Sequence, residues 1–590
     1  MLERPAVIAV FILLSLCLFL WGQIPEVQTT IRLSLPDSDD AMQFLSVRDL
    51  LAGQSWFDTT QYRFLPPAGA SMHWSRLLDA PMAGAIWALS KVLDPRLASG
   101  IVVTAWPLFL FAIYLGLIGF MTWRFFGMRA MGLAVLIASQ VMIFSDIFGV
   151  GRIDHHNAGA VLLSGAVMCY AVWDGSSRAP AIAGLLCALS LAVALETLPF
   201  VACIGVLYTL SWVFGEKHGE TALMRFAGFF AGGSLLAFGV QKAPSQWLVP
   251  RCDTLSTPWL LLTVGSGLAA LSLTQASPLK RASWHGRLAA TTAAGVLLVL
   301  GIAVAFPSCL GGPYHAVPEP FRTIWLNNVP EAVSFWRLWQ INPRAAVESF
   351  GPLLIAAGLA VAGGFWTEGK QRRLMIMLAS LLGLGVLLCQ EQIRGVYLAS
   401  AFIPLVAGWA LDKLVSSIQS ARVALARTAA LLCGSILIFG GPWTSGLAFA
   451  QALGLVAQPD TIVGGQSDVC LLDRNIKALA VLKPGVVLAP INLGPHTLLY
   501  TDHSIIAAGY HRAAEAIIAS IEAFSGSEAD LRRNANRYRA DYVVICPHWF
   551  VADAKRPKPF AQALAEGKRV SWLEPIRIEA GPLKVWRVRR

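Results

Sequence analysis

Residues 130–173 read "AMGLAVLIASQVMIFSDIFGVGRIDHHNAGAVLLSGAVMCYAVW", two apolar runs separated by a short polar turn. A membrane-spanning helix needs roughly 20 predominantly apolar residues, so each run is long enough to form one helix of a membrane hairpin. The turn, "GVGRIDHHNAG" at 149–159, contains Asp154, His155 and His156. Ionisable residues are costly beside lipid, so this turn is a candidate functional site.

Apolar runs of this kind recur along the chain. The protein has 590 residues, 56% of them hydrophobic and 14% charged, which excludes an ordinary soluble globular protein. We therefore predict a polytopic α-helical membrane protein whose transmembrane domain covers residues 1–450. On length and hydropathy we expect about thirteen membrane helices, at 5–22, 98–121, 130–148, 156–173, 179–196, 198–214, 222–240, 256–274, 286–306, 350–365, 372–390, 394–411 and 424–448.

The net charge of +11 is better explained by membrane topology than by nucleic-acid binding. Short loops rich in Lys and Arg lie on the cytoplasmic side of a membrane protein. One alternating set of loops carries most of these residues: Arg4, Arg124, Arg129, Arg178, Lys217, Lys280, Arg281, Lys370, Arg372, Arg373, Lys413 and Arg422. We therefore place the loops 23–97 and 307–349, the turn at 149–155 and everything after about 449 on the outer side of an inner (plasma) membrane. The first apolar run lacks a signal-peptide cleavage site and is expected to stay as a membrane helix.

The ten cysteines divide by their place in this topology. Four lie on the outer side, and the pairs Cys252–Cys309 and Cys470–Cys546 are candidate disulfides in an oxidising compartment, although sequence alone does not fix the pairing. The other six fall in predicted spans and are expected to pack as small apolar residues: Cys17, Cys169, Cys187, Cys203, Cys389 and Cys433.

Residues 460–590 are more polar than the rest and are predicted to form a small extracytoplasmic α/β domain. "GVVLAPINLG" at 485–494 and "DYVVICP" at 541–547 are typical of buried strands. "HRAAEAIIASIEAF" at 511–524 and "SEADLRRNANRY" at 527–538 are typical of amphipathic helices, the second with Ser527 as its N-cap.

The first outer loop carries Asp37, Asp39 and Asp40 just before a short amphipathic helix. One acidic residue is enough to cap a helix, and three clustered carboxylates repel one another unless a cation lies among them. Helix capping and a metal or catalytic site are both open for this cluster.

In the opening turn, Asp154 and His156 are two residues apart, and an Asp oxygen with an imidazole nitrogen suits Mn²⁺ or another divalent ion. A polar turn at the membrane interface is the simpler alternative.

The later outer segments add two acids and an arginine. Glu319 and Glu331 lie in the aromatic-rich loop 307–349 and are either solvated charges or the acid that completes a metal site. Arg394 begins a membrane helix, where arginine either extends toward the interface or binds a phosphate.

Taken in order, these residues resemble the GT-C glycosyltransferases that use polyprenyl-linked sugar donors. More narrowly, the chain resembles the single-subunit oligosaccharyltransferases of bacteria and archaea and the catalytic subunit of the eukaryotic complex. That family has an Asp nine residues before an Arg-Asp pair and then Ala-Gly, and here Asp39 stands nine before Arg48, followed by Asp49, Ala52 and Gly53. Its archaeal second motif looks like Asp-His-His, as at Asp154–His156. "NNVPE", ending in Glu331, and "IRGVY", with Arg394, match its loop and phosphate motifs.

The resemblance implies roles for these residues. Asp39, Asp154, His156 and Glu331 would hold Mn²⁺ or Mg²⁺, and Asp39, Asp154 and Glu331 would be catalytic, with Asp39 orienting or deprotonating the acceptor. Arg394 would bind the donor phosphate. Position alone makes further residues candidates for a substrate groove: His73, Trp74, Arg76 and His155, and also His511 and Arg512.

The chain also departs from that family. The oligosaccharyltransferases carry a Trp-Trp-Asp motif in the C-terminal domain, whereas the tryptophans after residue 449 are the separate Trp549, Trp572 and Trp586. The acceptor is therefore open: a glycan, a lipid or a protein. A transferase that moves one sugar onto a lipid or surface polysaccharide is the alternative within the enzymes. A lipid-linked substrate transporter is the alternative from another class, but the polar residues gather in outer loops and not at mid-helix.

Overall fold

The computed structural model describes residues 3–175, 178–314, 317–329, 331–419, 440–453, 467–549 and 558–590. The chain divides into two compact units. One unit, here called the helical unit, comprises Met1–Arg32, Asp94–His315 and Pro330–Pro459. The other contains both helices and strands, is here called the mixed unit, and comprises Leu33–Leu93, Ala316–Val329 and Asp460–Arg590. Residues 33–93, which make up most of the outer loop 23–97 expected in the transmembrane domain, thus belong to the same compact unit as the C-terminal segment.

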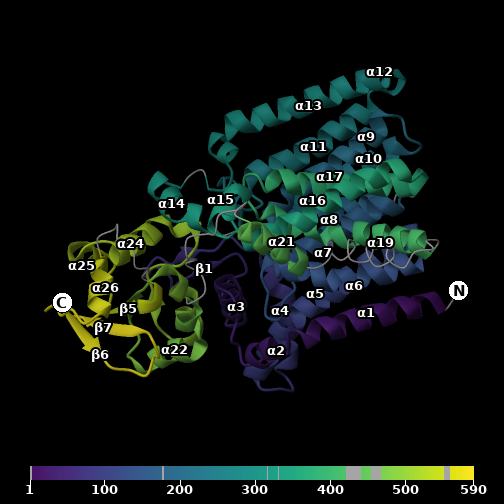
Figure 1. Ribbon diagram of the computed structural model, residues 1–590. Helices are drawn as coiled ribbons and strands as arrows, with labels where there is room; N and C mark the ends of the chain where they lie inside the picture. Colours follow the sequence, from purple (N-terminus) through teal and green to yellow (C-terminus); the bar gives the residue numbers. More distant parts are fainter. Residues whose placement is uncertain are drawn as a thin grey trace. The chain divides into compact units, whose positions relative to one another are not determined.

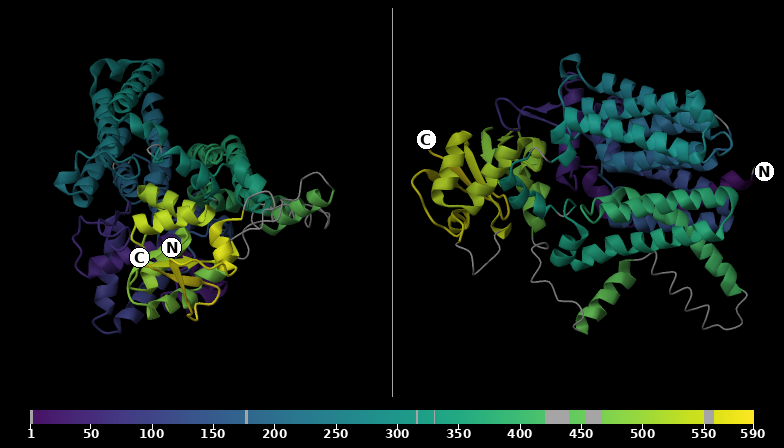
Figure 2. Two further views of the ribbon diagram at one scale, coloured as in Figure 1. Left: turned by 90° about the vertical axis from the view of Figure 1, so that its left-hand side faces the viewer. Right: turned by 90° about the horizontal axis from the view of Figure 1, so that it is seen from above.

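The helical unit consists of long apolar helices that lie side by side (Figures 1 and 2). The helices with more than twelve residues are α1 (Glu3–Trp21), α5 (Pro95–Phe126), α6 (Met128–Ser145), α7 (His155–Val172), α8 (Arg178–Val193), α9 (Leu198–Val213), α10 (Gly219–Gln241), α11 (Thr257–Gln275), α13 (Trp284–Ala305), α16 (Pro343–Trp366), α17 (Gly369–Leu388), α19 (Ile403–Gln419) and α21 (Gly440–Ala452). The shorter ones are α2 (Ile24–Thr30), α12 (Ser277–Arg281), α15 (Phe335–Ile341) and α18 (Gly395–Ala399).

These helices make the protein a multi-pass membrane protein, as predicted. Among the described residues, 8 helices are long and apolar enough to cross a membrane, or 9 if the bent pair α1 and α2 counts as one span. The predicted number of about thirteen is therefore not confirmed. Most of the last predicted span, 424–448, lies outside the described residues, as do Cys433 and Arg422.

Small residues bring the helices of this unit into close contact. Gly184 on α8 faces the backbone of α10, and a Cβ at this position would lie 2.4 Å from the carbonyl oxygen of Phe226. Lipid supplies no hydrophobic drive for helices to associate, so such close backbone approach is a main source of their packing energy.

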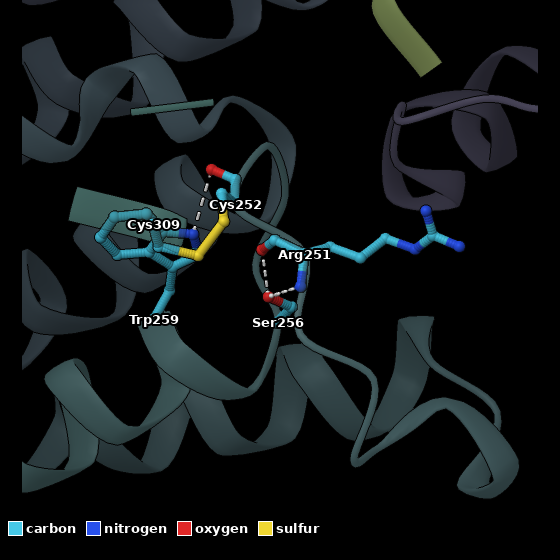
Figure 3. The surroundings of a disulfide bond; sticks show 5 residues. All are labelled: Arg251, Cys252, Ser256, Trp259 and Cys309. Carbon is cyan, nitrogen blue, oxygen red and sulfur yellow. Dashed lines mark hydrogen bonds between the residues drawn. A yellow bond between two sulfur atoms is a disulfide. The ribbon is translucent and has the colours of Figure 1, made fainter. Parts of the chain in front are cut away.

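The disulfide Cys252–Cys309 forms as predicted and joins the loop before α11 to the 3₁₀ turn η3 (Pro307–Gly311) after α13. Figure 3 shows how the loop is held around it. Trp259 Nε1 donates to the Cys252 carbonyl oxygen over 3.3 Å, and the backbone N–H of Arg251 donates to Ser256 Oγ over 3.1 Å. The disulfide thereby anchors the first residues of the segment 307–349.

The mixed unit contains a five-stranded sheet in the order β4-β3-β5-β7-β6. Its strands are β3 (Val486–Leu488), β4 (Ser504–Ile505), β5 (Tyr542–Ile545), β6 (Leu573–Ile576) and β7 (Lys584–Val588), and a separate pair is formed by β1 (Thr60–Gln61) and β2 (Ala70–Ser71). β3 pairs in parallel with β4 and β5, whereas β7 is antiparallel to β5 and β6. The α/β character predicted for the C-terminal segment is confirmed.

Among the described residues, the mixed unit also contains eight α-helices. They are α3 (Ser38–Leu51), α4 (Arg76–Leu89), α14 (Glu319–Ile324), α22 (Asp473–Lys477), α23 (Gly494–Tyr500), α24 (Ala514–Ser525), α25 (Glu528–Arg537) and α26 (Phe560–Ala565). Alternate residues of β5, Tyr542 and Val544, enter a core that also contains the second predicted disulfide, Cys470–Cys546. α25 begins at the predicted cap, where Ser527 and Asp530 form a capping box.

The segment 63–65 from the N-terminal part of the chain is hydrogen bonded to the edge of this sheet. The backbone N–H of Ile505 donates to the Arg63 carbonyl over 2.8 Å, and that of Leu65 donates to the Ile505 carbonyl over 2.9 Å. The Arg63 guanidinium donates to the carbonyls of Leu498 and Thr501 at the end of α23, over 2.6 and 2.7 Å. These contacts explain why residues 33–93 and 460–590 form one unit.

A buried ion pair holds the first loop in shape. Arg76 Nη1 lies 3.0 Å from Asp79 Oδ2, with both side chains at most 2% exposed. Arg76 also donates to the Ser46 carbonyl, to Gln54 Oε1 and to the Asp58 carbonyl. Burial outweighs the attraction of Arg76 and raises the pKa of the Asp79 carboxyl to about 6.

Stability of the mixed unit is expected to depend on its disulfide. Replacing both Cys470 and Cys546 with Ser releases a loop of 76 residues and should lower the free energy of unfolding by about 2–5 kcal/mol. Thermal unfolding of the purified protein measures the effect. Cys17→Ser, at an exposed free cysteine, is the control and should leave the melting temperature unchanged. Equal melting temperatures for all three proteins would contradict the prediction.

Asp79 gives a pH dependence with a defined sign. Its pKa is higher in the folded state than the ordinary value of 3.8, so the stability that its proton contributes is present below pH 4 and is lost as the pH rises through 6. The shift corresponds to a free energy on the order of 3 kcal/mol. Asp79→Asn stays neutral at all pH values and should flatten the fall in melting temperature between pH 4 and 7. An unchanged pH profile in the variant would refute this assignment.

Candidate active site

The turn between α6 and α7 is organised by Asp154, which is the N-cap of α7. Its Oδ1 accepts from the backbone N–H of His156 over 3.0 Å, and its Oδ2 lies 2.9 Å from Arg152 Nη2. Asn157 Nδ2 donates to the Arg152 carbonyl over 2.8 Å and closes the turn from the helix side. Local hydrogen bonds of the turn thus account for Asp154 and Asn157, and the cap at Asp154 places His155 and His156 in the first turn of α7.

A residue that the sequence analysis missed lies against these rings. Glu196 belongs to the 3₁₀ turn η1 (Leu195–Thr197) between α8 and α9. Its Oε1 lies 2.5 Å from His156 Nδ1 and 3.9 Å from His155 Nε2. The signal in the sequence was the acid in the otherwise apolar run "LSLAVALETLPFVAC", which we interpreted as the end of one span and the start of the next.

These three side chains fit a metal ion. Ligand atoms of His155, His156 and Glu196 all lie within 4.8 Å of one another, which is the only such group among the described residues. In the same described part of the chain, His155 Nδ1 and Glu196 Oε2 are buried without a hydrogen-bond partner. Buried polar atoms are nearly always paired, so two without partners at one place are consistent with a cation between them. Imidazole with carboxylate suits Mn²⁺ or Zn²⁺.

Arg394 and Glu331 form a second charged group in the helical unit. Glu331 Oε1 makes an ion pair with Arg394 Nη2, and the backbone N–H of Arg394 donates to the Glu331 carbonyl over 3.1 Å. Tyr314 lies 3.4 Å from Arg394 Nη1 through its hydroxyl. Glu331, predicted as a metal ligand, therefore contacts the predicted phosphate-binding arginine, and its rival Glu319 lies in the mixed unit beside Arg322.

Tyr397 connects the two groups. It follows Arg394 by three residues, and its ring centroid lies 5.3 Å from that of His156. Glu196 is also close enough to Arg394 for the two to attract each other. The helical unit thus brings together residues from four parts of the sequence. They are Asp154, His155 and His156 at the start of α7, Glu196 in η1, Glu331, and Arg394.

The predicted residues of the mixed unit gather around Tyr510. Asp37 is the N-cap of α3 and accepts from the backbone N–H of Asp39 over 3.0 Å, so the capping alternative is confirmed for Asp37. The Tyr510 hydroxyl donates to the Ser38 carbonyl over 3.0 Å. Burial, together with the nearby Asp39 and Asp37 carboxylates, raises the pKa of the Tyr510 phenol. Asp39 therefore lies beside a second carboxylate, that of Asp37, at the start of α3.

The predicted groove residues of this unit divide into a group of neighbouring side chains around His73 and the separately buried Arg76. The His73 ring lies 5.2 Å from His511 and 5.3 Å from Trp74, while Arg512 Nη1 donates to the Met72 carbonyl over 2.7 Å. Arg76 is buried in the ion pair described above. Its contacts give it a structural role, and the groove assignment of all these residues stays a prediction.

No protein-family model and no curated protein matches the sequence. Solved structures do match. Over 92% of this chain and 69% of the other, the fold resembles the archaeal oligosaccharyltransferase AglB from Archaeoglobus fulgidus in complex with an inhibitory peptide and a dolichol-phosphate, with a TM-score of 0.65 and 15% identity. The protein has the fold of a GT-C glycosyltransferase.

Two further structures also match. The Archaeoglobus fulgidus oligosaccharyltransferase in complex with Zn and sulfate matches with a TM-score of 0.61 and 14% identity, over 92% of this chain and 68% of that one. ArnT from Cupriavidus metallidurans matches with a TM-score of 0.41 and 13% identity, over 96% and 97% of the two chains. The match to the AglB structure, with its TM-score of 0.65, confirms the GT-C fold predicted from the sequence.

The Arg394–Glu331 pair should behave as a coupled unit. Each side chain is less than one third exposed, so removal of one charge leaves the other partly buried without its partner. In a double-mutant cycle with Arg394→Gln and Glu331→Gln, we expect a coupling free energy of about 0.5–3 kcal/mol from thermal unfolding.

The control cycle uses Arg344 and Glu348 on α16, where the Arg344 side chain is 73% exposed. Solvent screening should keep that coupling below about 0.5 kcal/mol. Equal coupling free energies in the two cycles would show that the Glu331–Arg394 ion pair contributes no more to stability than an exposed pair, and would contradict the prediction.

Proposed function

We propose that the protein is a membrane glycosyltransferase. It transfers a sugar or oligosaccharide from a polyprenyl-phosphate or polyprenyl-diphosphate donor to an acceptor on the outer face of the membrane. The observation that carries this proposal is the meeting of Asp154, His156 and Glu196 with Arg394 in one unit of a GT-C fold. An acidic and imidazole-rich site beside an arginine suits a phosphate leaving group and a divalent ion.

The ligands of the similar structures agree with such a substrate. AglB was solved with an inhibitory peptide and a dolichol-phosphate, and the Archaeoglobus fulgidus oligosaccharyltransferase was solved with a tethered acceptor peptide containing the NVT sequon and with Zn and sulfate. We infer by analogy that a lipid-linked phosphate is the donor of this chain.

In this mechanism the anomeric bond to phosphate breaks, and negative charge develops on the departing phosphate oxygen. Arg394 is a permanent cation with a planar fork of donors, so it binds the phosphate and stabilises that charge. Donor binding at Arg394 requires its ion pair with Glu331 to open or to be shared. Glu331 would then be available for the metal role predicted from the sequence.

Asp154, His156 and Asp39 would hold Mn²⁺ or Mg²⁺, which supplies further neutralisation of the leaving group. Asp39 would also orient or deprotonate the acceptor hydroxyl or amide. Asp39 belongs to the mixed unit, and its assignment rests on the sequence motif.

A transferase that moves a single sugar onto a lipid or surface polysaccharide is the second candidate. It is favoured by the sequence after residue 449, which has no Trp-Trp-Asp motif. The donor chemistry is the same in both cases, so the first experiment does not need the acceptor.

The test is metal binding followed by donor turnover in detergent. After chelation, wild type should bind Mn²⁺ with micromolar affinity, and Asp154→Ala and Asp39→Ala should lose this binding because each removes a ligand. With Mn²⁺ present, wild type should slowly hydrolyse radiolabelled polyprenyl-phosphate or polyprenyl-diphosphate sugars, and Arg394→Ala should reduce that rate by at least about 10²-fold through lost charge stabilisation.

Arg337→Ala is the matched control for Arg394, because Arg337 is an exposed arginine on α15 that contacts Gln340. It should retain the wild-type rate. Absence of Mn²⁺ binding would overturn the metal-dependent mechanism. Absence of turnover with every lipid-linked sugar, together with movement of such lipids across vesicle membranes, would support a transporter instead.

A further inference from the structure

The distance between Glu196 Oε1 and His156 Nδ1 distinguishes two roles for the carboxylate, which are ligand of the metal and hydrogen-bond acceptor from the imidazole. Two atoms bound to one metal at about 2.1 Å each lie roughly 3 Å or more apart. Glu196 Oε1 and His156 Nδ1 are 2.5 Å apart, which is a hydrogen-bond distance between an imidazole N–H and a carboxylate. These two atoms therefore fit a donor and acceptor better than two ligands of the same ion.

We propose that Glu196 is a positioning residue that accepts a hydrogen bond from His156 Nδ1–H and so presents His156 Nε2 to the metal. Ligating histidines in proteins commonly donate their other ring N–H to a carboxylate, which fixes the tautomer and the orientation of the ring. The inference rests on the proposed function in that it takes His156 to be a metal ligand.

Local structure holds Glu196 in place for this role. The turn η1 packs directly on α7 at Gly159, where a Cβ would lie 3.3 Å from Thr197 Cγ2 and 3.4 Å from Ala194 Cβ. Thr197 Oγ1 donates to the Ala194 carbonyl over 2.8 Å and fixes the turn itself. The glycine stands one helical turn after His155, so its missing side chain leaves room for Ala194 and Thr197, which flank Glu196, beside the histidines.

The ring of His156 is also held on other sides. Its backbone N–H is capped by Asp154, and the Tyr397 ring lies against it. The His156 side chain is only 5% exposed. With Nδ1 occupied by Glu196, the ring atom left for a ligand is Nε2.

The other atoms of this group fit the same role. Glu196 Oε1 is also 3.9 Å from His155 Nε2, beyond hydrogen-bond distance. One carboxylate therefore binds His156 directly and faces His155 more loosely.

The first test measures Mn²⁺ affinity of the full chain by electron paramagnetic resonance titration, without donor. Glu196→Ala should weaken binding about 10–100-fold, the loss typical of an outer-shell carboxylate. Glu196→Gln keeps an acceptor oxygen for Nδ1–H and should recover most of that loss. The control Glu348→Ala removes a carboxylate of the same unit that pairs with Arg344, and it should bind Mn²⁺ as wild type does.

The second test reads the tautomer directly in metal-free protein labelled with ¹⁵N-histidine. Wild type should show a His156 signal with Nδ1 protonated and Nε2 unprotonated, assigned by its loss in His156→Asn. Glu196→Ala should lose this preference, which a change in stability alone would not produce.

The outcomes separate this proposal from the proposed function. Wild-type Mn²⁺ affinity in Glu196→Ala would overturn the positioning role while leaving a metal-dependent transferase intact. Equal losses in the Ala and Gln variants would overturn it in favour of direct ligation by the carboxylate. Donor turnover in a wild type that binds no Mn²⁺ would overturn the metal role of His156, and with it the positioning role, but not the transferase.

Discussion

A charge at the end of a membrane helix is costly unless an opposite charge or a hydrogen-bond donor lies against it, because neither lipid nor an apolar core solvates it. The helical unit meets this requirement at three places: Asp154 pairs with Arg152, Glu196 with the His156 ring, and Glu331 with Arg394. Two of the three pairs join segments far apart in sequence. The same contacts that make the charges tolerable therefore also bring the candidate site residues together.

Much of the fold was predictable because hydrophobicity and turn chemistry act locally. The apolar runs predicted the membrane helices, Ser527 predicted the start of α25, and the topology grouped four cysteines that form two disulfides. Two features were not predictable. The segment 63–65 pairs with β4 through only a few backbone hydrogen bonds, which leave no periodic pattern in the sequence. The number of membrane helices was not predictable either, because apolar runs such as 128–141 and 178–193 form helices too short to count as spans, and the region 420–439 lies outside the described residues.

The candidate site was half predictable for a similar reason. Asp154 and His156 stand in one polar turn, and the motif drew attention to them. Glu196 stands singly among apolar residues, so only the approach of η1 to Gly159 shows what it contacts. Glu331 and Arg394 were both singled out, but with separate roles, since a sequence does not show that two charges 63 residues apart neutralise each other.

The hydrogen bonds between Arg63 and the residues around His503 join positions 440 residues apart. During synthesis, the segment 33–93 is made long before its partners in the sheet and α23 exist. At ordinary elongation rates of about 5–20 residues per second, that interval is roughly 20–90 s. Phe64 and Met42, both fully buried in the finished unit, have no such burial during this time. The mixed unit is therefore the last part of the protein to fold, and its first segment depends on protection from aggregation while the membrane helices are being made.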